Sequence, residues 1–166
     1  IILMDEPFGA LDPITREQLQ DEFLALESEI QKTVLFVTHD VFEAVKMADR
    51  IALLDEGELQ QLAKPAELVD NPANEFVDQF LGQHRFQLSL LTQTIESVMN
   101  ACEQPPSVPE KEELRLNPRD SLIEALDSFK KTDEDGLPVV KQDEVVGVLK
   151  KKDLLEAITQ VMGEPV

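Results

Sequence analysis

The first third of the chain alternates between apolar runs and a helical stretch. Residues 1–4 and 33–38 are continuous apolar runs of strand length, which is typical of strands buried on both faces of a parallel sheet. Between them, residues 12–31 carry apolar side chains at helical spacing on one face and Glu, Gln and Asp on the other. The order strand, helix, strand predicts a βαβ unit. The apolar face of the helix consists of Leu19, Phe23, Leu26 and Ile30.

A short helix is expected directly after the second strand. Asp40 is placed to cap its first turn, and Glu43 three residues later makes a capping-box variant. One side of this helix is apolar: Val41, Ala44, Val45 and Ala48.

A β-hairpin and two short helices are predicted next. Residues 51–54 and 58–62 read as two strands, and Gly57 between them supplies a positive φ for the turn. The second of the two helices, over residues 73–81, stops at Gly82.

The pattern then loosens. Apolar residues 86, 88 and 90 alternate as in a strand, residues 95–99 favour a helical stretch, and 104–109 form a proline-rich loop. We therefore divide the chain into residues 1–82, a connector over 83–107, and a second unit over 108–166.

The second unit has its own repeating order of elements. We expect a strand, a helix, two strands and a helix, with Asp120 or Ser121 starting the first helix. Their ranges are 114–116, 122–129, 137–140, 145–149 and 152–162. With the βαβ unit, this order indicates an α/β fold followed by a small α+β unit.

Composition narrows the class of protein. The 166 residues include 42% hydrophobic side chains, enough for a core, and carry a net charge of −19. Such acidity argues against nucleic-acid binding, which needs clustered Lys and Arg. Net charge is −13 over residues 1–82 and −6 over 83–166, which also suggests two units.

The sequence shows none of the patterns expected of a membrane span, a signal peptide or an internal disulfide. No apolar run approaches the roughly 20 residues of a membrane span, and the apolar N-terminus lacks the charged region of a signal peptide. A single cysteine, Cys102, fits a reducing cytosol and reads as a small apolar residue. His84 has no partner in sequence and is expected to be solvated. We expect a soluble protein.

Candidate chemistry gathers where the first strand ends. Asp5 and Glu6 follow the apolar run directly, as carboxylates do at the end of a parallel strand. Residues 7–9 break the strand, and Asp12 followed by Pro13 begins the helix. Another polar residue, His39, ends the second strand.

These motifs resemble the C-terminal part of an ABC-type ATPase, from the Walker B strand onward. The matching segments are DEPFGALDP, VLFVTHD and EAVKMADRIALLDEGELQQ. Two more, ALDPITR and NPANEFVDQFLG, look most like the ATPase subunits of importers for glycine betaine, carnitine and choline. The implied fold is the parallel-sheet portion of an incomplete P-loop NTPase.

The resemblance implies a role for each matching residue. Asp5 would hold Mg²⁺ through water, and Glu6 would polarise the attacking water. His39 would contact the γ-phosphate, and Asp12 would lie in the D-loop at the interface of two ATPase domains. The structural alternatives are an acidic cluster at strand ends, a surface histidine and a simple helix cap.

The motifs that wrap phosphate are missing from this chain. It contains no G-x-x-x-x-G-K-[ST] and no Leu-Ser-Gly-Gly-Gln. ATP and Mg²⁺ are therefore expected in a longer parent subunit, and we expect no ATP hydrolysis by this chain alone. The apolar strand at residues 1–4 should be covered by another chain or swapped segment, or else aggregate.

The second unit resembles a CBS domain repeat, through GLPVV and VVGVLKKKDLLEAI. By that resemblance Asp153 would contact a ribose, and Leu137, Pro138 and Val139 would face a base. The ligand would be an adenine nucleotide or cyclic di-AMP. Lys150 departs from the pattern, since a Ser or Thr normally stands three residues before the Asp.

Two further expectations concern this unit. The basic triplet at residues 150–152 reads either as a solvated helix start or as a contact for phosphate or an anionic membrane. Because one clear repeat is visible, we expect pairing with a repeat of another chain, and hence a homodimer.

Three functions remain open from the sequence. The first is the ATPase subunit of a quaternary-amine importer, bound to membrane subunits and a second ATPase subunit at the inner face of the plasma membrane. The second is a regulatory CBS module that senses an adenine nucleotide or ionic strength. The third is an inactive, dimerising fragment.

Overall fold

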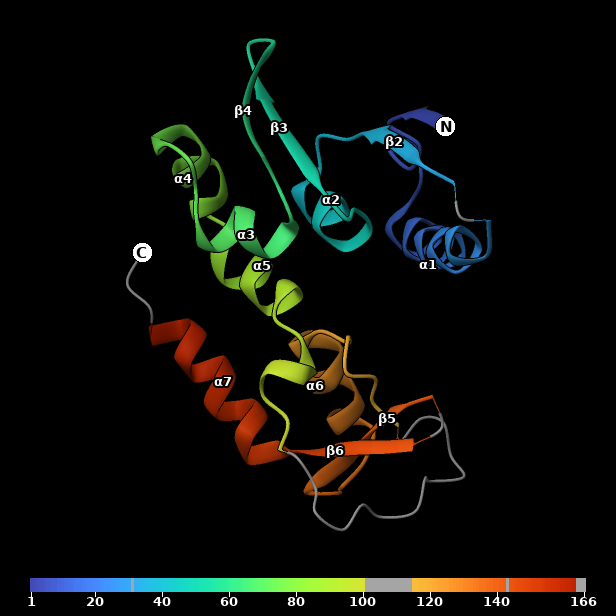
Figure 1. The fold of residues 1–166 in the computed structure, drawn as a ribbon, viewed down its shortest axis with the longest axis vertical. Coiled ribbons are helices and arrows are strands. Elements are labelled where there is room, and N and C mark those ends of the chain that lie inside the picture. The colour runs from blue at the N-terminus through green and yellow to red at the C-terminus, as the bar shows by residue number, and fades with distance from the viewer. Residues whose placement is uncertain (31, 101–114, 143, 164–166) are drawn as a thin grey trace.

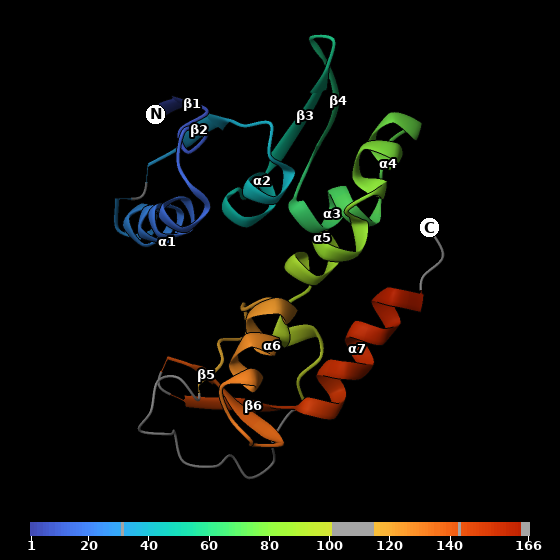
Figure 2. The ribbon, with the colours of Figure 1, turned by 180° about the vertical axis from the view of Figure 1, so that it is seen from behind.

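The computed structural model describes residues 1–30, 32–100, 115–142 and 144–163, apart from the side chains of 27–30. Figures 1 and 2 show two lobes from opposite sides. Residues up to 82 form one lobe, residues from 115 onward form most of the other, and a short helix at 85–92 lies between them.

The N-terminal lobe begins with the βαβ unit that the apolar pattern predicts. Strand β1 (Ile2–Asp5) is followed by helix α1 (Pro13–Ile30) and strand β2 (Val34–Val37). The two strands are parallel, in a register that runs from Ile2 opposite Val34 to Asp5 opposite Val37. The prediction is confirmed, and both strands end at the same edge.

Burial within this unit is incomplete. Phe23 of α1 packs edge-on against Phe8, with ring centroids 6.3 Å apart, but Leu19 and Leu26 are exposed. The helix is therefore confirmed, while much of its apolar stripe faces solvent. On β2, Leu35 and Val37 are 60% and 57% exposed. That another chain or segment covers this sheet stays a prediction.

A first core forms around the next elements. Buried apolar side chains of the β-hairpin and of the helices before and after it pack together. Among them are Ile51, Ala63, Leu68 and Val69. The hairpin is antiparallel as predicted, and Gly57 has a φ of +83° at its turn. The elements are α2 (Val41–Met47), β3 (Ile51–Asp55), β4 (Glu58–Ala63), α3 (Pro65–Asp70) and α4 (Glu75–Gly82).

The segment expected to alternate as a strand is instead helix α5 (Arg85–Thr92), so that prediction is wrong. Leu88 joins the first core, while Leu90 joins the core of the second lobe. The solvation predicted for His84 holds in part: its side chain is half-buried, and its ring packs edge-on against Phe42 with the ring centroids 5.1 Å apart. A 3₁₀ turn, η1 (Ile95–Ser97), follows and agrees with the helical stretch predicted there.

The C-terminal lobe has the element order predicted for it. Leu116 bridges in parallel to Val139, and Ser121 caps the first helix in a full capping box with Glu124. Helices α6 and α7 contact each other and share the second core with the antiparallel strand pair. The elements are α6 (Leu122–Lys130), β5 (Gly136–Lys141), β6 (Glu144–Lys150) and α7 (Lys151–Gly163).

Some expectations fall outside the described residues. These are the apolar character of Cys102, the proline-rich loop at 104–109 and the start of the strand at 114.

Candidate functional site

The strand ends bring the predicted catalytic residues together. Glu6 directly follows β1, and its backbone N–H donates to the carbonyl of Val37 at 2.9 Å, which continues the strand pairing one step. Its φ is +46°, a left-handed conformation that costs about 1–3 kcal/mol in a residue other than glycine. The sharp turn that follows is closed by the N–H of Gly9, which donates to the Glu6 carbonyl.

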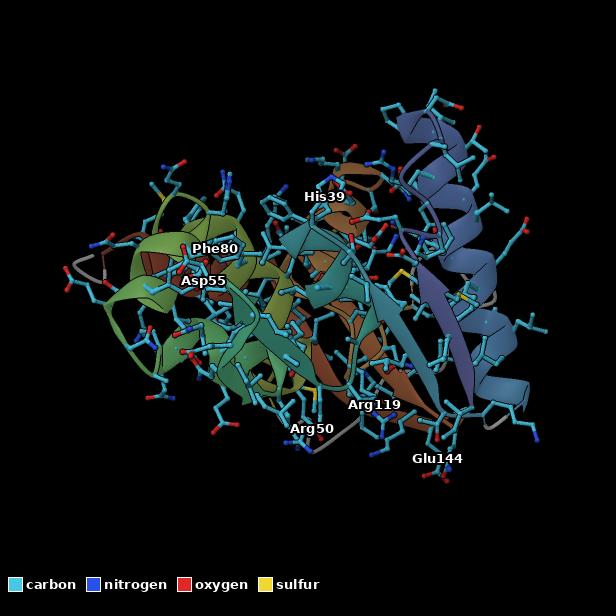
Figure 3. All side chains as sticks on the ribbon, turned by 90° about the horizontal axis from the view of Figure 1, so that it is seen from above. His39, Arg50, Asp55, Phe80, Arg119 and Glu144 are labelled. Carbon is cyan, nitrogen blue, oxygen red and sulfur yellow. The ribbon has the colours of Figure 1, made fainter. Side chains whose placement is uncertain are left out.

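Glu6 is in direct contact with His39. The Oε1 atom of Glu6 lies 2.8 Å from Nδ1 of His39. A carboxylate can only accept, so the ring donates through Nδ1, and Nε2 stays available for another partner. The hydrogen bond and then the charge of Glu6 raise the pKa of His39. Figure 3 shows His39 on the outside of the molecule, and its side chain is 82% exposed.

Asp12 caps helix α1, and Asp40, which directly follows His39, caps helix α2. The N–H groups of Ile14 and Thr15 donate to Asp12 Oδ1, each at 3.2 Å. Hydrogen bonds from Thr15, through its side chain and then its backbone, lower the pKa of Asp12. The cap interpretation of Asp12 is thus confirmed, while its role at an interface stays a prediction.

Asp40 caps α2 as predicted, but the capping box does not form. Asp40 Oδ1 accepts from the N–H groups of Phe42 and Glu43, and the Asp40 N–H donates to Oγ1 of Thr38. Glu43 turns instead to Gln20 of α1, whose Nε2 donates to its Oε1 at 2.9 Å. Both side chains are buried, and this partner from another element replaces the backbone contact of the capping box.

Asp5 stands at the end of β1 and is exposed. A hard carboxylate of this kind fits Mg²⁺, which keeps several waters and uses one or two carboxylates together with phosphate oxygens. Among the described residues, no group of three or more His, Cys, Asp or Glu side chains is arranged to hold a metal. The role of Asp5 as a Mg²⁺ ligand stays a prediction.

The predicted ligand residues of the second lobe divide into two groups. Leu137 and Val139 point into the core, whereas Pro138 between them is half-buried. Asp153, in the first turn of α7, accepts a hydrogen bond from Nδ2 of Asn100. The structure does not bring Leu137 and Val139 to the surface beside Asp153.

Asn100 was not singled out by sequence reasoning. It pairs with β6 through two backbone hydrogen bonds with Val148, both 3.1 Å long, which carry its side chain to Asp153. No local pattern marks it, because its partners lie about fifty residues further along the chain.

Lys150 at the end of β6 and Lys151 and Lys152 at the start of α7 are exposed. Lys152 Nζ lies 3.3 Å from a carboxylate oxygen of Glu156, one turn along the helix, and the Lys151 N–H donates to the carbonyl of Asp135. These contacts agree with the interpretation of residues 150–152 as a solvated helix start.

Comparison with known proteins identifies a CBS domain in the C-terminal part of the chain. The family model described as "CBS domain" matches residues 103–160. The glycine betaine/carnitine/choline transport ATP-binding protein OpuCA of Bacillus subtilis is 54% identical over 101 residues, which are 60% of this chain and 27% of that protein.

Two other relatives align along most of the chain. The choline transport ATP-binding protein OpuBA of Bacillus subtilis is 40% identical over 88% of this chain and 36% of its own length. The osmoprotectant import ATP-binding protein OsmV of Salmonella typhimurium is 38% identical over 95% of this chain and 39% of its own. This chain is a homologue of these transport ATP-binding proteins and contains a CBS domain.

The chain spans well under half the length of these three relatives. This chain combines a two-stranded parallel sheet with a CBS domain in one mixed α/β structure. No helix among the described residues is both long enough and apolar enough to cross a membrane.

Proposed function

We propose that this chain forms the C-terminal part of the subunit that hydrolyses ATP to drive an importer of glycine betaine, carnitine or choline. The contact between Glu6 and His39 carries this proposal, since it joins a base and a proton-bearing ring at the ends of adjacent parallel strands. The relatives with the same transport function support it.

Each side chain has a task in this proposal. Asp5 would hold Mg²⁺, which neutralises charge on the phosphates. Glu6 orients and polarises the attacking water, while His39, held by Glu6 through Nδ1, offers Nε2 to the γ-phosphate. Asp12, which caps α1, would meet the second ATPase subunit.

The chain by itself lacks the glycine-rich loop and its lysine, so we expect no ATP hydrolysis from residues 1–166 alone. Phosphate release by the isolated chain should equal a buffer blank. A rate above the blank that disappears in E6Q would contradict this expectation.

The main test uses the full-length subunit assembled with its membrane subunits, at the cytoplasmic face of the membrane. We expect E6Q and H39A to lose ATP hydrolysis and osmolyte uptake while still binding ATP. Full activity in either variant would overturn the proposal, and E58Q, on the exposed hairpin, is the matched control for E6Q.

A second function concerns the CBS domain, for which we propose binding of an adenine nucleotide. The end of β6 is exposed, and the Asp153 carboxylate accepts a hydrogen bond from the amide of Asn100. These groups favour a polar ligand beside the end of β6. Paired CBS units of two chains would complete the site and form a homodimer.

Calorimetric titration of the chain with AMP, ATP and cyclic di-AMP tests this second function. A ligand at about one hundred times its Kd should add about 2.7 kcal/mol to the free energy of unfolding. D153N should weaken binding, and D127N, on the exposed side of α6, should not. Absence of heat and of stabilisation with all three nucleotides would exclude it.

A further inference from the structure

Polar contacts join helix α1 to helix α2 and to its capping residue Asp40. The Gln20 to Glu43 hydrogen bond lies at the centre of this contact and is buried. An ion pair stands on each side of it. The pairs are Arg16 with Asp40 at 3.8 Å and Asp21 with Lys46 at 2.7 Å.

Arg16 differs from the other residues of these polar contacts because it also reaches the loop before α1. Its Nη1 faces Asp40 Oδ2, while its Nη2 donates to the carbonyl oxygen of Leu11 at 3.3 Å. Leu11 immediately precedes Asp12, and Asp40 immediately follows His39. One guanidinium group therefore spans the two loops that carry these proposed functional residues.

The side chain of Arg16 is also partly buried. It is 32% exposed, and its Nε is buried without a hydrogen-bond partner. The flat guanidinium can serve two acceptors in different directions at once, whereas a lysine ammonium is a point charge on a flexible stem. Holding both loops thus requires an arginine.

We propose that Arg16 is a positioning residue for ATP hydrolysis, fixing the Asp12 loop relative to His39. This inference rests on the proposed function of the preceding subsection. Arg16 acts through Asp40 and the Leu11 carbonyl and touches neither nucleotide nor water itself. A change at the Asp12 loop would reach His39 through this group.

The test measures kcat and KM for ATP in the full-length subunit within its transporter. R16Q should lower kcat by about 10- to 100-fold, since a misplacement of about 1 Å can cost about 100-fold. KM for ATP should stay near the wild-type value. R16K should recover part of the loss, because it can still pair with Asp40.

Two matched controls separate this role from general stability. K46Q removes the ion pair at the far end of the same helix contact, and R85Q removes another ion pair whose arginine also has a buried Nε. Neither touches the two loops, so both should keep the wild-type kcat.

Each outcome of this test either supports or overturns the positioning role of Arg16. A wild-type kcat in R16Q, or an equal fall in K46Q and R85Q, overturns the inference and leaves the proposed function standing. Absence of hydrolysis by the wild-type transporter overturns both. Where R16Q fails to fold, D40N decides, since asparagine still caps α2 but removes the charge: a normal kcat in D40N contradicts the inference.

Discussion

His39 Nδ1 lies 2.8 Å from Glu6 Oε1, although 33 residues separate them in the sequence. The Glu6 carboxylate stabilises the protonated ring and so raises the pKa of His39 above its ordinary value of 6.5. The pair therefore stabilises the fold below pH 6.5, and this contribution is lost as the pH rises through the raised pKa. An NMR titration of the His39 ring in wild type and E6Q measures the effect.

We expect the pKa of His39 to fall back toward its ordinary value in E6Q and to stay raised in E58Q. Glu58 is an exposed carboxylate on the β3–β4 hairpin and serves as the control. An unchanged pKa in E6Q would show that the contact is not formed in solution.

The buried hydrogen bond between Gln20 and Glu43 gives a second prediction. E43A leaves the Gln20 amide buried without a partner, which should lower the free energy of unfolding by about 1–3 kcal/mol. Urea unfolding measures this loss. D21A breaks the more exposed ion pair with Lys46, worth about 0–1 kcal/mol. Equal losses in the two variants would contradict the prediction.

The capping box at the start of α6 gives a third prediction. Ser121 accepts from the N–H of Glu124, whose carboxylate in turn accepts from the N–H of Ser121. S121A should lower the free energy of unfolding by about 0.5–2 kcal/mol. Ser128, half-buried in the same helix with its hydroxyl at the surface, is the control, and S128A should change stability by no more than about 0.5 kcal/mol. The prediction is wrong if S121A is as stable as S128A.

The close approach of residues 99 and 100 to β6 gives a fourth prediction. A Cβ at Gly147 would lie 2.9 Å from the Asn100 carbonyl oxygen and 3.0 Å from Met99 Sδ. G147A should therefore weaken the paired hydrogen bonds between Asn100 and Val148. Faster hydrogen exchange of these two amides is the expected result.

Gly82 is the control for this substitution, because a Cβ there would meet nothing within 4 Å. G82A should leave exchange at Asn100 and Val148 unchanged. Protection in G147A equal to that of wild type would show that residues 99 and 100 move aside without cost.

Local patterns predicted the elements whose signals lie within one segment. The apolar run before Asp5 and the helical spacing after Asp12 were enough for the βαβ unit, and the start of α6 was placed at Asp120 or Ser121, of which Ser121 is the cap. These patterns depend on near neighbours in the chain, and tertiary structure did not override them.

The errors arose where distant partners decide the structure. Leu88 and Leu90 fit both an alternating strand and a helix, and the helix prevails because it directs them into two different cores. Glu43 matched a capping box, but Gln20, 23 residues away, is its partner. The contacts of Arg16 and Asn100 likewise required the assembled fold.

Helix α5 belongs to both cores and contacts α2, α3, α6 and α7. A domain boundary placed on either side of α5 would remove a buried leucine, Leu88 or Leu90, from one of the two cores. A chimera that exchanges the CBS domain between related transporters should therefore carry a matching version of this helix. The part to exchange is the CBS domain together with helix α5, because that helix contributes a buried side chain to each core.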